Sequence, residues 1–224
     1  MARTREVAGG GRAVEVEPER VAGWFTRFTA RHGDLVAVDA DRGRLRFWAA
    51  DGASAEVVVP FGGLPPAAAP AEPAAVLAAL HAHLLRPRRL GIVLVRLGGH
   101  SVGIAVDAVV QASTTRTRPV HGRTRKGGSS SGRFARRRDN QARVALDAAA
   151  DAVARLLLPA AASLDAVVLG GDTAALAELR ADRRLAPLLA RAETRVLDVP
   201  EPRRAVLDEA ARRARAVEIV VREP

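Results

Sequence analysis

The chain has 224 residues, 48% of them hydrophobic, so it can form one large domain or two small ones with a buried core. It has no cysteine, which excludes a disulfide framework and any cysteine metal site, and its first twelve residues lack the apolar run of a secretory signal. No segment approaches the roughly twenty apolar residues that cross a bilayer. We therefore expect a cytoplasmic protein without a membrane partner, and a monomer.

The positive charge of the chain is concentrated in one segment. The formal net charge is +10, and between Ala112 and Arg143 ten cations stand against the single anion Asp139. Because arginine is frequent throughout, its placement is more informative than its count. A local excess of this kind favours a polyanionic partner, most commonly a phosphate backbone. The ten cations are Arg116, Arg118, Arg123, Arg125, Lys126, Arg133, Arg136, Arg137, Arg138 and Arg143.

Residues 1–61 are predicted to form a small α+β unit. Pro18 suits the first turn of a helix, and an apolar stripe with the spacing i, i+3, i+4 and i+7 starts at Val21 and ends before Gly33. Runs typical of strands follow at 35–38, 44–48 and 56–59. Both tryptophans of the unit, Trp24 and Trp48, are predicted as core residues.

A segment rich in Pro, Ala and Gly, residues 62–73, is predicted to link this unit to a second domain. Residues 74–224 alternate strands and helices, which predicts an α/β domain with a mixed sheet flanked by helices. A hairpin opens the sheet, a basic loop at 112–132 follows, and later strand–helix–strand crossovers predict parallel pairing. The predicted strands are 91–97, 102–109, 166–169, 195–199 and 217–221, and the predicted helices are 74–85, 133–158, one from about 173, and 203–214.

No pattern of residues predicts a metal site or a cofactor. The five histidines lack the spacing of metal ligands. Asp147 and Asp151, at i and i+4 on the long helix, could hold Mg²⁺ as a nuclease pair on an RNase H-like sheet. Such sites need several converging carboxylates, so a solvated helix face is favoured. The turn Gly170–Asp172 lacks the full dinucleotide and P-loop patterns, so Asp172 is predicted as a helix N-cap.

The tip of the basic loop, GGSSSG at Gly127–Gly132, has two interpretations. It could be a flexible linker in which Ser130 or Ser131 caps the following helix. The cations on both sides and the long helix after it favour a probe instead. Arginines would grip phosphates while a tip poor in side chains enters a narrow site.

At this loop the sequence resembles the middle domain of the eukaryotic and archaeal class 1 translation termination factors, in which a GGQ tripeptide precedes an RFARLR-like run. Gly127, Gly128 and the RFARRR run at Arg133–Arg138 match in residue type and spacing. The chain resembles still more closely the Vms-like release factors of actinobacteria, whose RFARRRDNQA segment stands here at Arg133–Ala142. The strand and turn at Leu94–Val106 also match, so the resemblance covers roughly residues 88–221.

The resemblance implies a release-factor middle-domain fold and a peptidyl-tRNA hydrolase that acts on stalled ribosomes or large subunits. In that family the glycines let the tip enter the peptidyl transferase centre, and a glutamine beside them helps to place the attacking water. This chain departs from the family at that point, with serines where the glutamine is expected. The implied catalytic residues are Gly127, Gly128, Ser129, Ser130 and Ser131, and the implied RNA-binding residues are Arg123, Arg125, Lys126, Arg133, Arg136, Arg137 and Arg138.

The implied partners are the large-subunit rRNA and peptidyl-tRNA, and no cofactor is implied. The missing glutamine leaves two hypotheses open. Backbone amides of Gly128 and Ser129 can still face an oxyanion, and a seryl hydroxyl can orient a water, which predicts a weakened hydrolase. The alternative is a non-catalytic factor that binds the ribosome or tRNA and has lost the loop glutamine.

Overall fold

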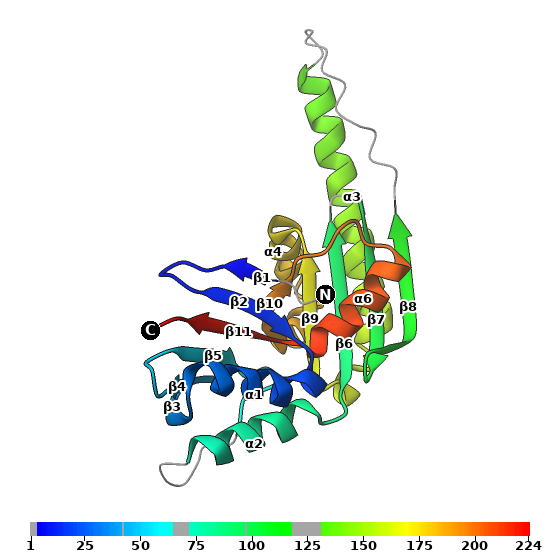
Figure 1. The fold of residues 1–224 in the computed structure, drawn as a ribbon. Helices are drawn as coiled ribbons and strands as arrows, with labels where there is room; N and C mark the ends of the chain where they lie inside the picture. The colour runs from blue at the N-terminus through cyan, green and yellow to red at the C-terminus, as the bar shows by residue number, and fades with distance from the viewer. Residues whose placement is uncertain (1–3, 42, 65–71, 97, 118–130) are drawn as a thin grey trace. The chain divides into compact units, whose positions relative to one another are not determined.

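The computed structural model describes residues 4–41, 43–64, 72–96, 98–117 and 131–224, and within 131–141 it describes the backbone alone. The chain forms two compact units, which Figure 1 draws as ribbons. Unit 1 consists of residues 1–87 and 215–224, and unit 2 of residues 88–214. Among the described residues, no helix has the length and apolarity to cross a membrane.

Unit 1 is a six-stranded antiparallel sheet with strand order β1-β2-β11-β5-β4-β3. A short 3₁₀ turn at Pro18–Arg20 leads into the first of its two helices. Its helices are α1 (Val21–His32) and α2 (Pro73–Leu84). Its strands are β1 (Thr4–Glu6), β2 (Arg12–Val16), β3 (Leu35–Asp41), β4 (Arg44–Ala49), β5 (Ser54–Val58) and β11 (Val217–Arg222).

The two faces of this sheet differ because its strands alternate apolar and polar residues. On β4, Leu45 and Phe47 are buried and face the helices, and the ring of Phe47 lies 5.0 Å from that of Phe25 on α1. The alternate positions of β4 carry charged and polar side chains on the other face. Trp48 is one of these: it is half-buried and donates a hydrogen bond to Asp39. The prediction that Trp48 is a core residue is therefore wrong. Trp48 is next to the buried Phe47 in the strand, so its side chain points to the face of the sheet away from the helices.

The C-terminal strand completes the sheet of unit 1. Strand β11 pairs with β2 on one side and β5 on the other, so it lies inside the sheet rather than at its edge. Its residues Val217, Ile219 and Val221 belong to the core that also contains residues of α1 and α2. The sequence-based division at residues 62–73 had placed both α2 and β11 with the following domain. The structure differs because β11 buries its apolar face in the first sheet.

Unit 2 is a mixed five-stranded sheet with strand order β10-β9-β6-β7-β8. Strands β10, β9 and β6 are parallel, while β6, β7 and β8 form an antiparallel meander. The expected mixed α/β sheet is confirmed. The strands are β6 (Arg89–Arg96), β7 (Gly99–Val106), β8 (Val109–Thr117), β9 (Ala166–Gly171) and β10 (Ala192–Leu197). The helices are α3 (Ser131–Leu157), α4 (Thr173–Ala181), α5 (Ala186–Leu189) and α6 (Arg204–Arg215), with a 3₁₀ turn at Ala161–Ser163.

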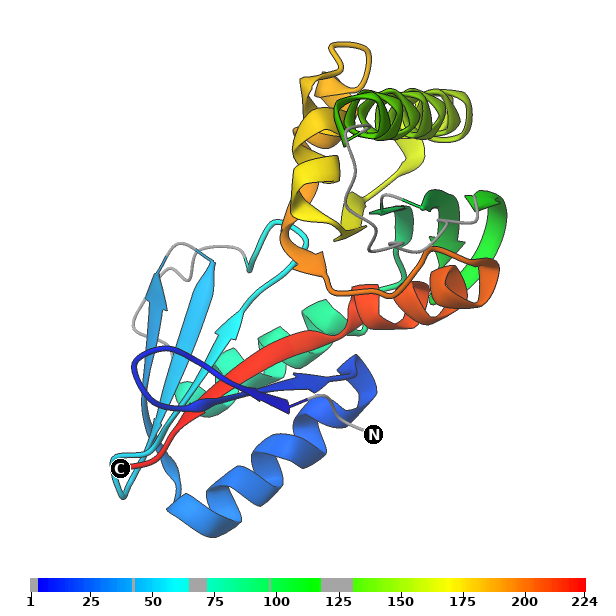
Figure 2. The ribbon, with the colours of Figure 1, turned by 90° about the horizontal axis from the view of Figure 1, so that it is seen from above.

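Helices cover both faces of the unit 2 sheet. Figure 2 shows α3 and α4 on one face and α6 on the other. The core against α3 includes Val93 and Val102 of the sheet and Val153 of the helix. On the opposite face Leu207 of α6 approaches Gly103 so closely that a side chain there would collide with it. Between its terminal arginines, strand β6 is apolar and buried from Leu90 to Val95, as expected for a strand that is covered on both faces.

Three strands differ from the sequence-based expectations. Strands β1 and β2 were not predicted, and residues 112–117, expected in the basic loop, lie in strand β8. β8 is an edge strand rich in Thr and Ser, with exposed or half-buried residues throughout. It therefore lacks the apolar alternation by which strands are recognised.

Candidate nucleic-acid interface

The basic loop connects strand β8 to helix α3. β8 ends at Thr117 and α3 begins at Ser131, so the structure fixes both ends of the loop. The tip residues between them lie outside the described residues. These are Arg123, Arg125, Lys126, Gly127, Gly128, Ser129 and Ser130.

The other predicted site residues lie on the N-terminal turns of α3. Ser131 is the first residue of the helix, and Arg133, Arg136, Arg137 and Arg138 follow within its first two turns. Positions i, i+3 and i+4 share one side of a helix, so positions 133, 136 and 137 are neighbours on the helix surface. The structure thus places four predicted RNA-binding residues next to the end of the loop.

Helix α3 is anchored to the sheet through its C-terminal half. It has 27 residues, which at about 1.5 Å per residue gives a length of about 40 Å. Its C-terminal half packs on the sheet through Ala149, Val153 and Leu157, all fully buried. Its N-terminal turns extend past the ends of the strands (Figure 1). The sequence explains this difference, because RFARRRDNQAR has no apolar stripe to bury, whereas the later turns do.

The root of the loop at β8 is held by a tight ladder with β7. Thr117 pairs with Gly99, and a Cβ atom on Gly99 would lie 2.2 Å from the carbonyl oxygen of Arg116. Two positions further along, the hydroxyls of Ser101 and Thr115 share a hydrogen bond of 2.6 Å. Only glycine fits the approach of the two strands here. The loop therefore begins from a closely fitted pair of strands.

His100 lies in this ladder directly opposite Arg116 and is 4% exposed. Burial lowers the pKa of His100 below its ordinary value of 6.5, and the positive charges of Arg116 and Arg155 lower it further. The imidazole is therefore neutral at pH 7. Sequence reasoning missed this residue because it falls within an ordinary strand pattern, and its pairing with Arg116 became visible only once β8 was known.

This histidine predicts a loss of unit 2 stability in acid. The unfolded chain takes up a proton at His100 at a higher pH than the folded chain, so its contribution is present above pH 6.5 and is lost as the pH falls below it. We expect the free energy of opening of unit 2 to fall less between pH 7 and acid in His100→Gln than in the parent. Amide hydrogen exchange of β7 measures this, and identical pH profiles would contradict the prediction.

The loop root shares one edge of the sheet with three other strand ends. Strands β6, β9 and β10 run parallel to β8, so all four end at this edge. An open depression of about 440 Å³ lies beside the β6–β7 turn. The guanidinium of Arg96 donates to the carbonyl of Val199 at 2.6 Å there. The lining residues are Arg96, Gly98, Asp172, Pro200 and Glu201.

The remaining chemical candidates have structural roles. Asp172 accepts hydrogen bonds from the amides of Ala174 and Ala175, which confirms it as the N-cap of α4. Asp151 forms an ion pair of 2.9 Å with Arg184 on an exposed surface, as expected for a solvated helix face. Within the described ranges, no three His, Asp or Glu side chains are grouped so that they could hold a metal ion.

The sequence of unit 2 matches a known family. The model of the Actinobacteria/chloroflexi VLRF1 release factor family matches residues 88–220, more than half of the chain. The chain belongs to this family. The match begins where unit 2 begins and ends within β11. No curated protein matches the chain.

Membership in the VLRF1 release factor family gives the chain a release-factor-like role in translation, at the ribosome. It also agrees with the mixed α/β fold of unit 2. Residues 1–87 lie outside the matched range.

Proposed function

We propose that this VLRF1 release factor family member hydrolyses the ester between peptide and tRNA on stalled ribosomes or large subunits. Gly127 and Gly128 would shape the tip of the loop, and Ser129, Ser130 and Ser131 would help to position the water. The large-subunit rRNA and the peptidyl-tRNA are the proposed partners.

The observation that carries this proposal is how the fold holds the two ends of the loop, at strand β8 and helix α3. Its incoming strand is closely paired with β7 at Gly99, and in its outgoing helix the described side chains at 142–148 are exposed or half-buried, with full burial from Ala149. The first turns of α3, where the loop ends, therefore project with four arginine positions. A probe that must reach a site inside an RNA assembly needs such a stiff support and phosphate-binding cations near its end.

The serines alter the chemistry without removing all of it. Ester hydrolysis needs a placed water and donors aimed at the developing oxyanion, and backbone N–H groups of Gly128 and Ser129 can act as those donors. A seryl hydroxyl is shorter than a glutamine side chain, so it positions a water less well. The loss of one well-placed donor commonly costs about a hundredfold in rate. We propose a slow hydrolase.

A second function is supported by the same substitution. The sequence GGSSS at 127–131 has no glutamine, which favours a factor that occupies the ribosome or tRNA without turnover. Such a factor would bind with strong salt dependence but release no peptide. Single replacements of Ser129, Ser130 or Ser131 by Gln would then create release activity on an otherwise intact support.

Single-turnover release of labelled peptide from peptidyl-tRNA on isolated large subunits tests the proposal. We expect the parent to release peptide and Gly128→Trp to be slower by about a hundredfold or more, because bulk at the tip displaces it from the reacting ester. Val109→Trp is the matched control, since it introduces the same side chain at an exposed position at the far end of β8.

The control should release peptide at the parent rate. Equal rates for the parent and Gly128→Trp would contradict the assignment of the tip. No release from the parent, together with salt-sensitive binding to large subunits, would support the non-catalytic factor instead.

A further inference from the structure

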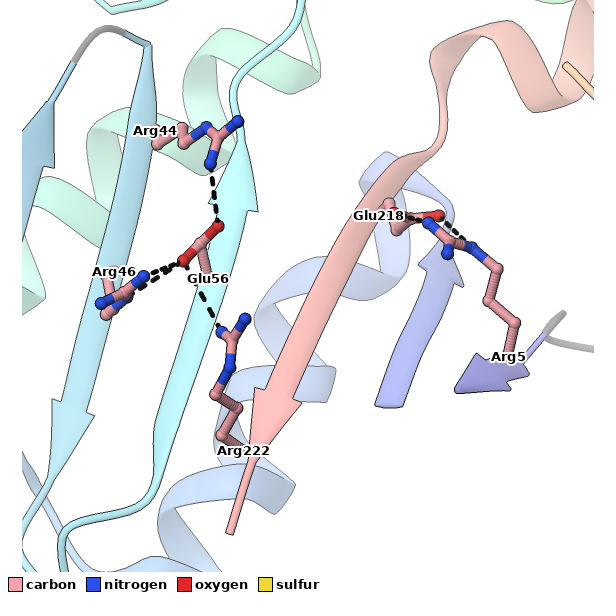
Figure 3. Close-up of polar contacts among 6 residues, drawn as sticks. All are labelled: Arg5, Arg44, Arg46, Glu56, Glu218 and Arg222. Atoms are coloured by element: carbon pink, nitrogen blue, oxygen red, sulfur yellow. Dashed lines mark hydrogen bonds and ion pairs between the residues drawn. The ribbon is translucent and has the colours of Figure 1, made fainter. Parts of the chain in front are cut away.

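Unit 1 carries a cluster of arginines on the face of its sheet that points away from α1 and α2. Figure 3 shows Arg44 and Arg46 of β4 and Arg222 of β11 converging on Glu56 of β5, the strand between them. Arg46 is hydrogen-bonded to Glu56, with Nε 3.0 Å from Oε2. Arg44 and Arg222 approach the same carboxylate at 3.6 and 3.7 Å. One carboxylate therefore faces three guanidinium groups.

The arginine side chains of this cluster are more exposed than the carboxylate. The side chain of Glu56 is 10% exposed, whereas those of Arg44, Arg46 and Arg222 are 64%, 42% and 36% exposed. The hydrogen bond from Arg46 holds the pKa of Glu56 below its ordinary value, against the effect of its partial burial, so the carboxylate is charged and neutralises one cation. The three arginines and Glu56 together therefore carry a net charge of +2.

Other carboxylates lie on the same face of the sheet, around this cluster. Glu218 is held by Arg5, with Oε1 2.6 Å from Nη2 (Figure 3), and Asp39 accepts from the indole of Trp48 at 3.1 Å. Asp41 and Asp39 lie opposite Arg44 and Arg46 in the ladder, on the edge strand β3. Over β4, β5 and β11 the face carries Arg44, Arg46 and Arg222 against Glu56 and Glu218, and Glu218 is paired with Arg5.

An aromatic side chain lies within the same cluster. The guanidinium carbon of Arg46 is 5.8 Å from the ring centroid of Trp48, and the half-buried Trp48 shares a face of β4 with Arg44 and Arg46. Guanidinium groups that grip phosphates beside an aromatic ring are the combination by which proteins bind single-stranded nucleic acid. An acidic peptide would use the cations but not the ring.

We propose that this face of unit 1 binds single-stranded RNA. Arg44, Arg46 and Arg222 contact the phosphates, and Trp48 provides a surface for a base. Glu56 fixes the three guanidinium groups in place before the RNA arrives. The proposal goes beyond peptide release, because it gives the protein a second contact with RNA that is separate from the basic loop.

The test compares the double variant Arg44→Gln/Arg222→Gln with the parent, both as full chains. Arg46 is kept, so Glu56 retains its hydrogen-bonded partner. The matched control is Arg20→Gln/Arg27→Gln, which removes the same charge from exposed positions at and just before helix α1. Fluorescence anisotropy with a labelled single-stranded RNA oligonucleotide is measured over a range of salt concentrations.

Each phosphate contact to a single strand contributes about 0.7 to the slope of log K against log salt. We expect the slope of the double variant to be shallower by about 1.4, and that of the control to equal the parent's. A second readout is local: in a Trp24→Phe background Trp48 is the sole tryptophan, and RNA should quench its fluorescence. The double variant should lose that quenching.

An unchanged slope, or quenching that persists in the double variant, would overturn the proposal. Quenching by a polyglutamate peptide and not by RNA would also overturn it, and would assign the face to an acidic protein. Peptide release enters neither readout, so failure of this surface leaves the release proposal standing, and failure of release leaves this surface standing.

Discussion

Removal of residues 216–224 is expected to unfold unit 1 while unit 2 stays folded. The deletion takes away β11, which separates β2 from β5 in the sheet, so the sheet would be split in two. Val217, Ile219 and Val221 are nearly fully buried, and burial of each such side chain is worth about 1.5–3 kcal/mol. A loss of about 6 kcal/mol is comparable to the whole stability of a small domain.

Tryptophan fluorescence measures this result directly. The two tryptophans of the chain, Trp24 and Trp48, both belong to unit 1, so their emission should shift to that of exposed indole. Amide exchange of β6 and β9 should show that unit 2 keeps its protection. The point variant Ile219→Asp should have the same effect, because it buries an unpaired charge in the same core.

Deletion of residues 1–6 is the matched control for the C-terminal deletion. It also removes a strand of the same sheet, but β1 has three exposed residues and lies at the edge. We expect a change below about 1 kcal/mol, as for other exposed positions. Native tryptophan emission in the C-terminal deletion, or unfolding in both deletions, would contradict the assigned role of β11.

The sequence predicts the individual strands and helices of this fold better than it predicts which strands pair with one another. The run at 217–221 is recognisable as a strand from its alternating apolar residues. The sheet to which it belongs cannot be recognised in the same way, because its partner strands lie more than 150 positions away in the sequence. Asp172 could be assigned as a cap because capping is decided within three residues. β8 escaped recognition because an edge strand rich in Thr and Ser buries little.

In the candidate sites, too, local features are predictable from the sequence and features that depend on strand pairing are not. The cationic loop and the RFARRR run are visible in the sequence because charge and spacing are local. The arginine cluster of unit 1 is not, because Arg44, Glu56 and Arg222 come from three strands and are brought together only by the register of the sheet. His100 is similar, since its burial and its pairing with Arg116 follow from the ladder of β7 and β8.

Gly99→Ala is expected to destabilise unit 2 by about 3 kcal/mol, at the upper end of the usual cost of overpacking. The new Cβ would lie 2.2 Å from the carbonyl oxygen of Arg116 and 3.0 Å from the Cα of Thr117. Both are backbone atoms, so the methyl group can be admitted only if β8 moves away from β7. That movement breaks the ladder at the residue from which the basic loop begins. Amide exchange of residues 100–106 measures the loss of protection.

Gly91→Ala in the adjacent strand β6 is the matched control for this prediction. Its added methyl group meets only side-chain ends, those of Leu164 at 3.1 Å and Leu157 at 3.2 Å, which can shift by a few tenths of an ångström. The same chemical change in the same sheet should therefore cost about 1 kcal/mol or less. If the two variants lose equal stability, the close approach of β8 to Gly99 does not hold the beginning of the loop in place. That result would also contradict the proposal that the loop has a stiff support.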